Sequence, residues 1–315
     1  MQDQQFIAAI ANEADGQVEA ADPLKTLRPT QSAGASSTIA HIAYVLKSNP
    51  VTLVSFGLFF LMVLAAVLGP YIVPYDPLAS NSAATLQPPS WAHWFGTDQL
   101  GRDVFSRIVI ATRLDLFIAT SAVALSFVIG SILGSLAGYF GGWFDTISGR
   151  VIDTIMAFPL FVLAMGIVAA LGNTVENIIY ATAIINIPFY ARVARGEVNI
   201  RRNAGFVHAA RLSGNNDLRV LALHIFPNAL PPMMVQISLN LGWAILNAAG
   251  LSFIGLGVRP PTPEWGIMVA EGAQFIVSGE WWLAFFPGIC LMLAVLTFNL
   301  MGDGLRDMVD PAQRT

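Results

Sequence analysis

The sequence predicts an all-α membrane protein that crosses the bilayer six times, with both termini in the cytoplasm. Of its 315 residues, 55% are hydrophobic and only 11% are charged, whereas a soluble domain carries about twice that charged fraction. Long charge-free stretches also recur along the chain. Each is significant because roughly 20 apolar residues in a helix cross a hydrocarbon core about 30 Å thick.

Six spans follow from these stretches. Fifty residues precede the first span, which makes a cleaved signal peptide a poor fit. The fourth holds 15 uncharged residues interrupted by Pro188 and resembles a re-entrant helix when taken alone. It is counted as a span because the flanking helices otherwise cannot keep a consistent orientation. In chain order, the spans lie within residues 51–73, 116–144, 154–175, 176–192, 233–258 and 281–302.

Positive charge sets the predicted orientation, because cytoplasmic loops carry an excess of Lys and Arg. Six spans place twelve of these residues on the side of both termini: Lys25, Arg28, Lys47, Arg150, Arg192, Arg195, Arg201, Arg202, Arg211, Arg219, Arg306 and Arg314. The opposite side carries four: Arg102, Arg107, Arg113 and Arg259. Four tryptophans then lie near the outer interface, as amphipathic rings prefer: Trp91, Trp94, Trp281 and Trp282.

Three regions follow from the composition. Residues 1–44 are rich in Ala, Gln, Ser, Thr and acidic residues and are interrupted by Pro23 and Pro29, which predicts a disordered cytoplasmic tail. Residues 45–114 hold the first span and an external loop. Residues 115–311 hold the other five spans and a long cytoplasmic loop, 192–230.

Two patterns inside the spans predict close or polar helix contacts. Gly130, Gly134 and Gly138 recur every four residues and allow another helix backbone to approach. Packing within the subunit is the favoured interpretation, and a contact between subunits is the alternative. Gln236 and Asn240, with Asn247 further along the same helix, form a polar stripe that either makes interhelical hydrogen bonds or lines a water-filled path.

Motifs for catalysis are missing from the sequence. There is no G-x-x-x-x-G-K-[ST] phosphate loop, no H-E-x-x-H zinc motif and only one cysteine, Cys290. No basic block indicates nucleic-acid binding. The predicted spans also lack ionisable residues near their centres, which disfavours a proton- or ion-coupled carrier. We therefore expect no enzyme, no metal site and no cofactor bound by this chain.

The cytoplasmic loop 192–230 is too long for a simple link between neighbouring helices. Residues 206–213 predict a short helix that ends at Gly214, which accepts the left-handed conformation that closes a helix. Asp217 then caps a second helix, 218–226, which stops at Pro227. The short helix either lies on lipid headgroups or fits into a groove of a partner.

This loop resembles the "EAA" loop of ATP-binding-cassette importer permeases through Ala209, Ala210, Gly214 and Pro227, with His208 in place of the family's usual Glu. Three further segments are similar to the "C"-type permeases of the dipeptide/oligopeptide/nickel family, and the resemblance covers residues 45–311. They are Phe95-Gly96-Thr97-Asp98-x-x-Gly101-Arg102-Asp103-Val104-Phe105-Ser106-Arg107, Leu251 to Gly266 with its Pro260-Pro261-Thr262-Pro263-Glu264-Trp265-Gly266 end, and Gly302-Asp303-Gly304-Leu305-Arg306-Asp307.

The resemblance implies a type I importer permease in the bacterial inner membrane. It implies a homologous second permease subunit, two ATPase subunits that use ATP and Mg, and an external substrate-binding protein. In that family the loop helix docks into the ATPase, and here its residues are Phe206, His208, Ala209, Ala210, Arg211 and Gly214. Gly101-Arg102-Asp103 reads as a structural turn. Glu264 and Trp265 are candidates for contact with the binding protein, with a structural role as the alternative.

Peptides are the expected substrate, since they are the commonest cargo that the resemblance implies. Nickel is the alternative within the family. A channel or secondary transporter that acts alone is the competing class of protein, and separate ATPase partners distinguish the two.

Overall fold

The computed structural model describes residues 49–309, with side chains to residue 306. The predicted tail 1–44 and the basic residues Lys25, Arg28, Lys47 and Arg314 lie outside the described residues. The described residues belong to one unit that begins at Tyr44. Its helices are α3 (Pro50–Ile72), η1 (Ser82–Ala84), α4 (Val104–Phe140), α5 (Gly142–Met156), α6 (Leu160–Leu171), α7 (Val175–Arg201), α8 (Gly205–Leu212), α9 (Asp217–Val220), η2 (Leu221–Ile225), α10 (Phe226–Phe253), α11 (Trp265–Ala273) and α12 (Trp282–Val309).

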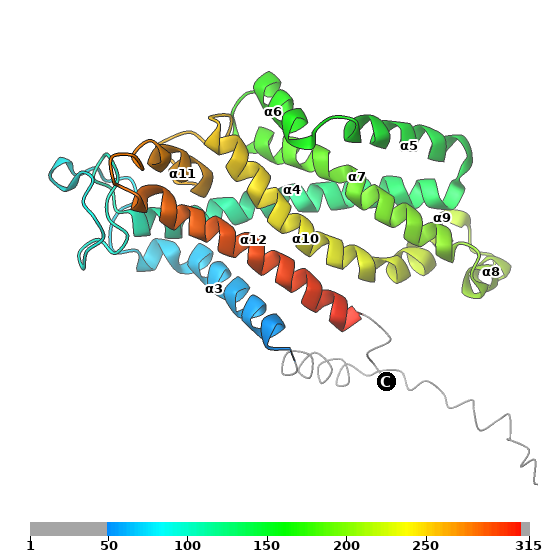
Figure 1. Cartoon of the computed structure of the whole chain (residues 1–315). Coiled ribbons are helices and arrows are strands. Elements are labelled where there is room, and N and C mark those ends of the chain that lie inside the picture. Colours follow the sequence, from blue (N-terminus) through cyan, green and yellow to red (C-terminus); the bar gives the residue numbers. More distant parts are fainter. Residues whose placement is uncertain (1–48, 310–315) are drawn as a thin grey trace, which may run out of the picture. The chain divides into compact units, whose positions relative to one another are not determined.

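The long helices run alongside one another in this unit. Figure 1 shows α8 beyond one end of the bundle, and the connection 73–103 and α11 at the other end. No strand occurs among residues 49–309; extended pairing there is limited to the bridge between Thr97 and Asp103. The all-α fold class is therefore confirmed for the described chain.

Four helical segments are long and apolar enough to cross a membrane: Pro50–Ile72, Val104–Phe140, Asp217–Phe253 and Trp282–Arg306. They contain the predicted first, second, fifth and sixth spans. α7 is continuous through Pro188, and its 27 residues measure about 40 Å. It is long enough to cross, but it is not among the four.

The predicted third span, 154–175, is not one continuous helix in the structure. The stretch 154–175 breaks before Pro159, and α5 and α6 meet at a bend of 89°. The residue before a proline is disfavoured in helical conformation, which accounts for the break. α6 alone has 12 residues, about 18 Å, and is too short to span. The bent pair together raises the number of candidate spans to five.

The glycine ridge on α4 packs against α7 inside the same chain, which confirms the favoured interpretation. A Cβ atom added to Gly130 would lie 2.7 Å from the Ile187 carbonyl oxygen, and one added to Gly138 would lie 2.6 Å from that of Arg195. Gly134 faces Ala191 even more closely. The two backbones therefore touch at three positions over about two turns, and only glycine fits at these positions.

The loop 192–230 is mostly helical and differs from the prediction in two ways. Asn216 caps α9, since its side chain accepts the Arg219 backbone N–H at 2.8 Å, so the predicted cap at Asp217 is wrong. The second helix does not stop at Pro227: α9 continues through the wider π-helical turn η2 into α10. Pro227 follows this π-helical turn directly, as the second residue of α10.

Candidate functional site

α8 is amphipathic, with one face packed on the chain and the other free. Val207 and Ala210 are buried against a small apolar cluster that includes Tyr139. At 100° per residue, the opposite face carries His208, Ala209 and Leu212, and all three are exposed. Leu212 is 90% exposed, which is unusual for a large apolar side chain at the end of a packed helix.

The predicted docking residues therefore divide into two groups. Phe206, Arg211 and Gly214 are exposed, as are His208 and Ala209 on the free face. Ala210 is 7% exposed and faces the chain's own core, so its predicted place in a docking surface is wrong. Its spacing of three residues from Val207 puts it on the buried side.

The sequence prediction did not include Leu212, although the spacing of apolar residues in α8 indicates that its side chain is exposed. Three apolar positions of the helix, Phe206, Val207 and Leu212, cannot all share one face at 100° per residue. Because Val207 faces inward, Leu212 must face outward.

Three polar side chains join α8 to the neighbouring end of α4. The Tyr139 hydroxyl donates a hydrogen bond to Asp217 Oδ1 at 2.5 Å and accepts one from Arg211 Nη2 at 3.0 Å. The Arg211 guanidinium carbon also lies 5.5 Å from the centre of the Tyr139 ring. The accepting hydroxyl raises the pKa of Arg211, so this residue stays charged. These contacts tie α8 to the end of α4 and to the start of α9.

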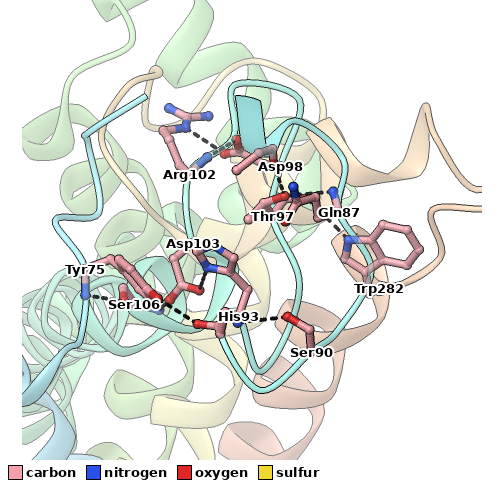
Figure 2. A network of polar contacts seen from close by, with 12 residues as sticks. Tyr75, Gln87, Ser90, His93, Thr97, Asp98, Arg102, Asp103, Ser106 and Trp282 are labelled. Atoms are coloured by element: carbon pink, nitrogen blue, oxygen red, sulfur yellow. Dashed lines mark hydrogen bonds and ion pairs between the residues drawn. The ribbon is translucent and has the colours of Figure 1, made fainter. Parts of the chain in front are cut away.

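At the other end of the bundle, the segment 95–107 folds into a tight polar turn, shown in Figure 2. Asp98 accepts the backbone N–H groups of Leu100 at 2.9 Å and Arg102 at 3.0 Å, and it also binds Arg102 Nε at 2.6 Å. Gly101 has φ +75°, which favours glycine. The structural interpretation of Gly101-Arg102-Asp103 as a locally paired turn is confirmed.

Asp103 fastens the start of α4 to the preceding connection. Its Oδ2 accepts the backbone N–H of Ser106 at 2.8 Å and the Ser106 hydroxyl at 2.7 Å, which caps the helix. Its Oδ1 lies 2.8 Å from His93 Nδ1, and the Tyr75 ring packs on the His93 ring with centroids 4.7 Å apart. Figure 2 shows these residues converging from the two sides of the connection.

Two buried arginines extend this turn to α11. Arg102 and Arg107 lie 3.7 Å and 3.6 Å from Glu271 Oε2, and Arg107 also lies 3.6 Å from Asp98. Burial raises the pKa of Glu271, while both guanidinium groups oppose that shift. The network holds two cations and two anions, so its formal charges balance. It locks the connection 73–103 onto α4 and α11.

Burial contradicts the predicted contact of Glu264 and Trp265 with an external protein. They are 1% and 2% exposed. Glu264 caps α11 by accepting the N–H groups of Gly266 at 2.9 Å and Ile267 at 2.7 Å, and burial raises its pKa. The Trp265 indole N–H donates to the Ile108 carbonyl at 3.1 Å. The structural alternative therefore holds for both residues.

Asp115 is the residue of this region that sequence reasoning missed. Its side chain is 4% exposed, and its Oδ2 accepts the Trp265 backbone N–H at 3.2 Å. Asp115 and Trp265 are 150 positions apart in the chain, so no local pattern predicts this contact.

The polar stripe of α10 is largely covered by the chain itself. Asn240 and Asn247 are 3% and 5% exposed. Gln236 Nε2 donates to Asn240 Oδ1 at 3.0 Å, and Asn247 Nδ2 donates to the Trp243 carbonyl at 2.9 Å. Of the three, Gln236 alone keeps partial exposure. Their role along a path stays a prediction.

No cluster of three or more His, Cys, Asp or Glu side chains within residues 49–309 has the geometry to hold a metal ion.

Comparison with known proteins defines the class. Residues 130–315 match the family model of binding-protein-dependent transport system inner membrane components, and residues 38–89 match the N-terminal transmembrane domain of oligopeptide transport permease C. The chain belongs to this family of inner membrane transport components. It is therefore a multi-pass, non-catalytic permease of an ATP-binding-cassette importer, which works with a separate ATPase and a substrate-binding protein.

Three relatives show how closely the chain resembles other members of the family. The probable D,D-dipeptide transport system permease protein DdpC of Escherichia coli (strain K12) is 43% identical over 272 residues, which cover 86% of this chain and 91% of the relative. The dipeptide transport system permease protein DppC of Alkalihalophilus pseudofirmus is 42% identical, covering 86% and 88%. The glutathione transport system permease protein GsiD of Escherichia coli (strain UTI89 / UPEC) is 42% identical, covering 80% and 83%.

Proposed function

We propose that this chain is one of two permease subunits of an inner-membrane importer that moves di- or oligopeptides, driven by ATP that two partner subunits hydrolyse. The substrate class rests on the relatives, which are named for dipeptides, D,D-dipeptides and glutathione, itself a small peptide. ATP and Mg bind to the partner subunits and not to this chain. A homologous second permease subunit completes the translocation path.

The proposed topology has six passes with both termini in the cytoplasm. α3, α4, α7, α10 and α12 supply five, and the bent pair α5–α6 supplies the sixth. Asn173, between α6 and α7, donates a hydrogen bond at 2.8 Å to the Gly255 carbonyl just after α10. That bond supports placing the α6–α7 turn and the end of α10 on one side. Residues 1–44 then form a cytoplasmic tail, 45–114 the first pass and external loop, and 115–311 the five-pass core.

The free face of α8 is the observation that carries the ATPase-coupling proposal. It presents His208, Ala209 and Leu212 outward while Tyr139 ties the same helix to α4. Docking of an ATPase subunit on this face would bury Leu212, and movement of that subunit would pull on α4 and α10. A cleft in the partner that closes on ATP binding then changes which side of the membrane the path faces.

Uptake by the reconstituted complex tests this function. The chain, its second permease subunit, the ATPases and the binding protein are placed in proteoliposomes and given labelled dipeptides or nickel. We expect ATP-dependent peptide uptake, which Leu212→Asp abolishes and Leu212→Met preserves, because aspartate introduces charge into a buried apolar contact. Nickel uptake without peptide uptake would replace the substrate class. Uptake without the ATPases would establish a transporter that acts alone.

A further inference from the structure

Arg113 is an exposed cation inside a membrane-spanning helix. α4 begins at Val104, so Arg113 lies nine residues, about 14 Å, along the helix. Its side chain is exposed and forms no ion pair with any residue of the described chain. A charged side chain inside a span is energetically unfavourable and therefore indicates a partner of opposite charge.

The acid nearest in sequence cannot be that partner. Asp115 lies two residues further on, which turns it about 200° around the helix to the opposite face. There it is buried and accepts the N–H of Trp265. The other arginines assigned to the same side differ from Arg113: Arg102 and Arg107 belong to the buried network, and Arg259 lies outside the helices.

The packing of α3 against α4 shows how deep Arg113 lies in the membrane: it is level with residues of α3 that precede the C-terminal end of that helix. A Cβ atom added to Gly69 would lie 3.1 Å from Val109 Cγ1, so these two residues are level. Arg113 follows Val109 by one turn, which brings it level with the turn of α3 before Gly69. With 23 residues, α3 measures about 35 Å and matches the hydrocarbon thickness. The base of the Arg113 side chain therefore lies within the hydrocarbon, and its long stem can extend toward the headgroups.

A hollow of about 370 Å³ lies beside Arg113. Four residues of the last turns of α3 complete its wall: Ala66, Val67, Pro70 and Tyr71. Three of them are apolar, and Tyr71 is 86% exposed near the end of the helix, where amphipathic rings prefer the interface. No acidic residue lines the hollow. The hollow thus combines an apolar wall with one cation, Arg113, whose side chain is long enough to extend to the lipid headgroups.

We propose that Arg113 and this hollow bind a phospholipid, with the guanidinium on the lipid phosphate and an acyl chain along Val67 and Pro70. A guanidinium offers two parallel N–H donors that match a phosphate, which an ammonium group does not. Charge complementarity selects an anionic ligand, and the apolar wall, in which Val67 is 61% exposed, selects a lipid. The bound lipid would fix α3 against α4 at this end of the bundle.

Lipid titration of the purified full-length chain, followed by native mass spectrometry, tests the proposal with dioleoylphosphatidylglycerol as the probe. We expect Arg113→Gln to weaken lipid binding about tenfold, as loss of a charged hydrogen bond predicts. Arg113→Lys should bind with intermediate affinity. The matched control, Arg259→Gln, removes an exposed arginine outside the spans and should bind lipid as the wild type does.

A second variant separates the hollow from the charge. Val67→Trp fills the apolar wall and keeps Arg113, so it should also weaken lipid binding even if Arg113→Gln fails to assemble. The proposal would be overturned if either variant, Val67→Trp or Arg113→Gln, bound the lipid as tightly as the wild type does. Displacement of the lipid by millimolar inorganic phosphate would show a phosphate site in place of a lipid site and would also overturn it.

Discussion

Tyr139 Oη and Asp217 Oδ1 lie 2.5 Å apart, and this hydrogen bond joins the end of α4 to the start of α9. The same hydroxyl accepts a hydrogen bond from Arg211 of α8. One side chain therefore connects the helix proposed to receive the ATPase with two long helices of the membrane domain. This arrangement makes the coupling proposal open to direct test by mutation.

Tyr139→Phe should reduce substrate-stimulated ATP hydrolysis by the assembled importer several-fold and leave the basal rate unchanged. The change removes a hydrogen bond to a charged partner, worth about 1.5–3 kcal/mol, but keeps the ring. The control is Tyr190→Phe, because the Tyr190 hydroxyl is buried and has no hydrogen-bond partner within residues 49–309. Full stimulation in Tyr139→Phe would show that the contact does not carry coupling.

The sequence predicts those features of the fold and the site that residues close together in the chain determine, and it misses contacts between residues that are far apart. The apolar runs identify α3, α4, α10 and α12 because composition alone decides whether a helix can cross a bilayer. α8 is predicted because Gly214 follows a short helical pattern. The anchor on Tyr139 could not be predicted, since it is separated from Arg211 and Asp217 by 72 and 78 positions. Such pairings arise only from the tertiary fold.

Two prolines show that the local sequence also does not decide where a helix breaks. Pro159 follows a break with an 89° bend, while Pro188 lies inside the continuous helix α7. Their local sequences do not separate these outcomes. Pro188 is buried where α7 packs closely on the glycine face of α4, so tertiary contacts hold that helix straight despite the lost hydrogen bond. Pro159 is exposed and has no such support.

Gly214→Val should abolish substrate-stimulated ATP hydrolysis while the chain still inserts into the membrane. Gly214 has φ +81°, and nothing lies within 4 Å of an added Cβ, so strain of the backbone is the sole penalty. That strain is about 1–2 kcal/mol for an ordinary residue and larger for a β-branched one. Gly214→Ala should give an intermediate loss. The control is Gly196→Ala in α7, where space is also open but φ is helical. Unchanged stimulation in Gly214→Val would contradict a role for the end of α8 in coupling.

Gly134→Val should destabilise the chain by separating α4 from α7. An added side chain would collide with the Ala191 backbone, which cannot move without displacing α7. Overpacking of this kind costs about 1–3 kcal/mol or more. Thermal unfolding in detergent should show a lower midpoint and poor yield. Gly166→Ala in α6, where nothing lies within 4 Å of the new Cβ, should unfold as the wild type does or slightly later. A wild-type midpoint in Gly134→Val would mean that the two helices are not packed as described.

The Glu264 cap of α11 should make stability depend on pH. Burial raises the pKa of Glu264 above its ordinary value. At a pH between the ordinary pKa of the unfolded chain and the raised pKa of the folded chain, the folded chain binds more protons than the unfolded chain. The contribution of this carboxyl to stability is therefore full below that window of pH and is lost as pH rises through it. The side chain of Glu264→Gln cannot ionise. The unfolding midpoint of the variant, relative to that of the wild type, should therefore rise as pH rises through this window. A Glu264→Gln midpoint that moves in parallel with the wild type would show that this carboxyl keeps the same proton affinity in the folded and unfolded chain.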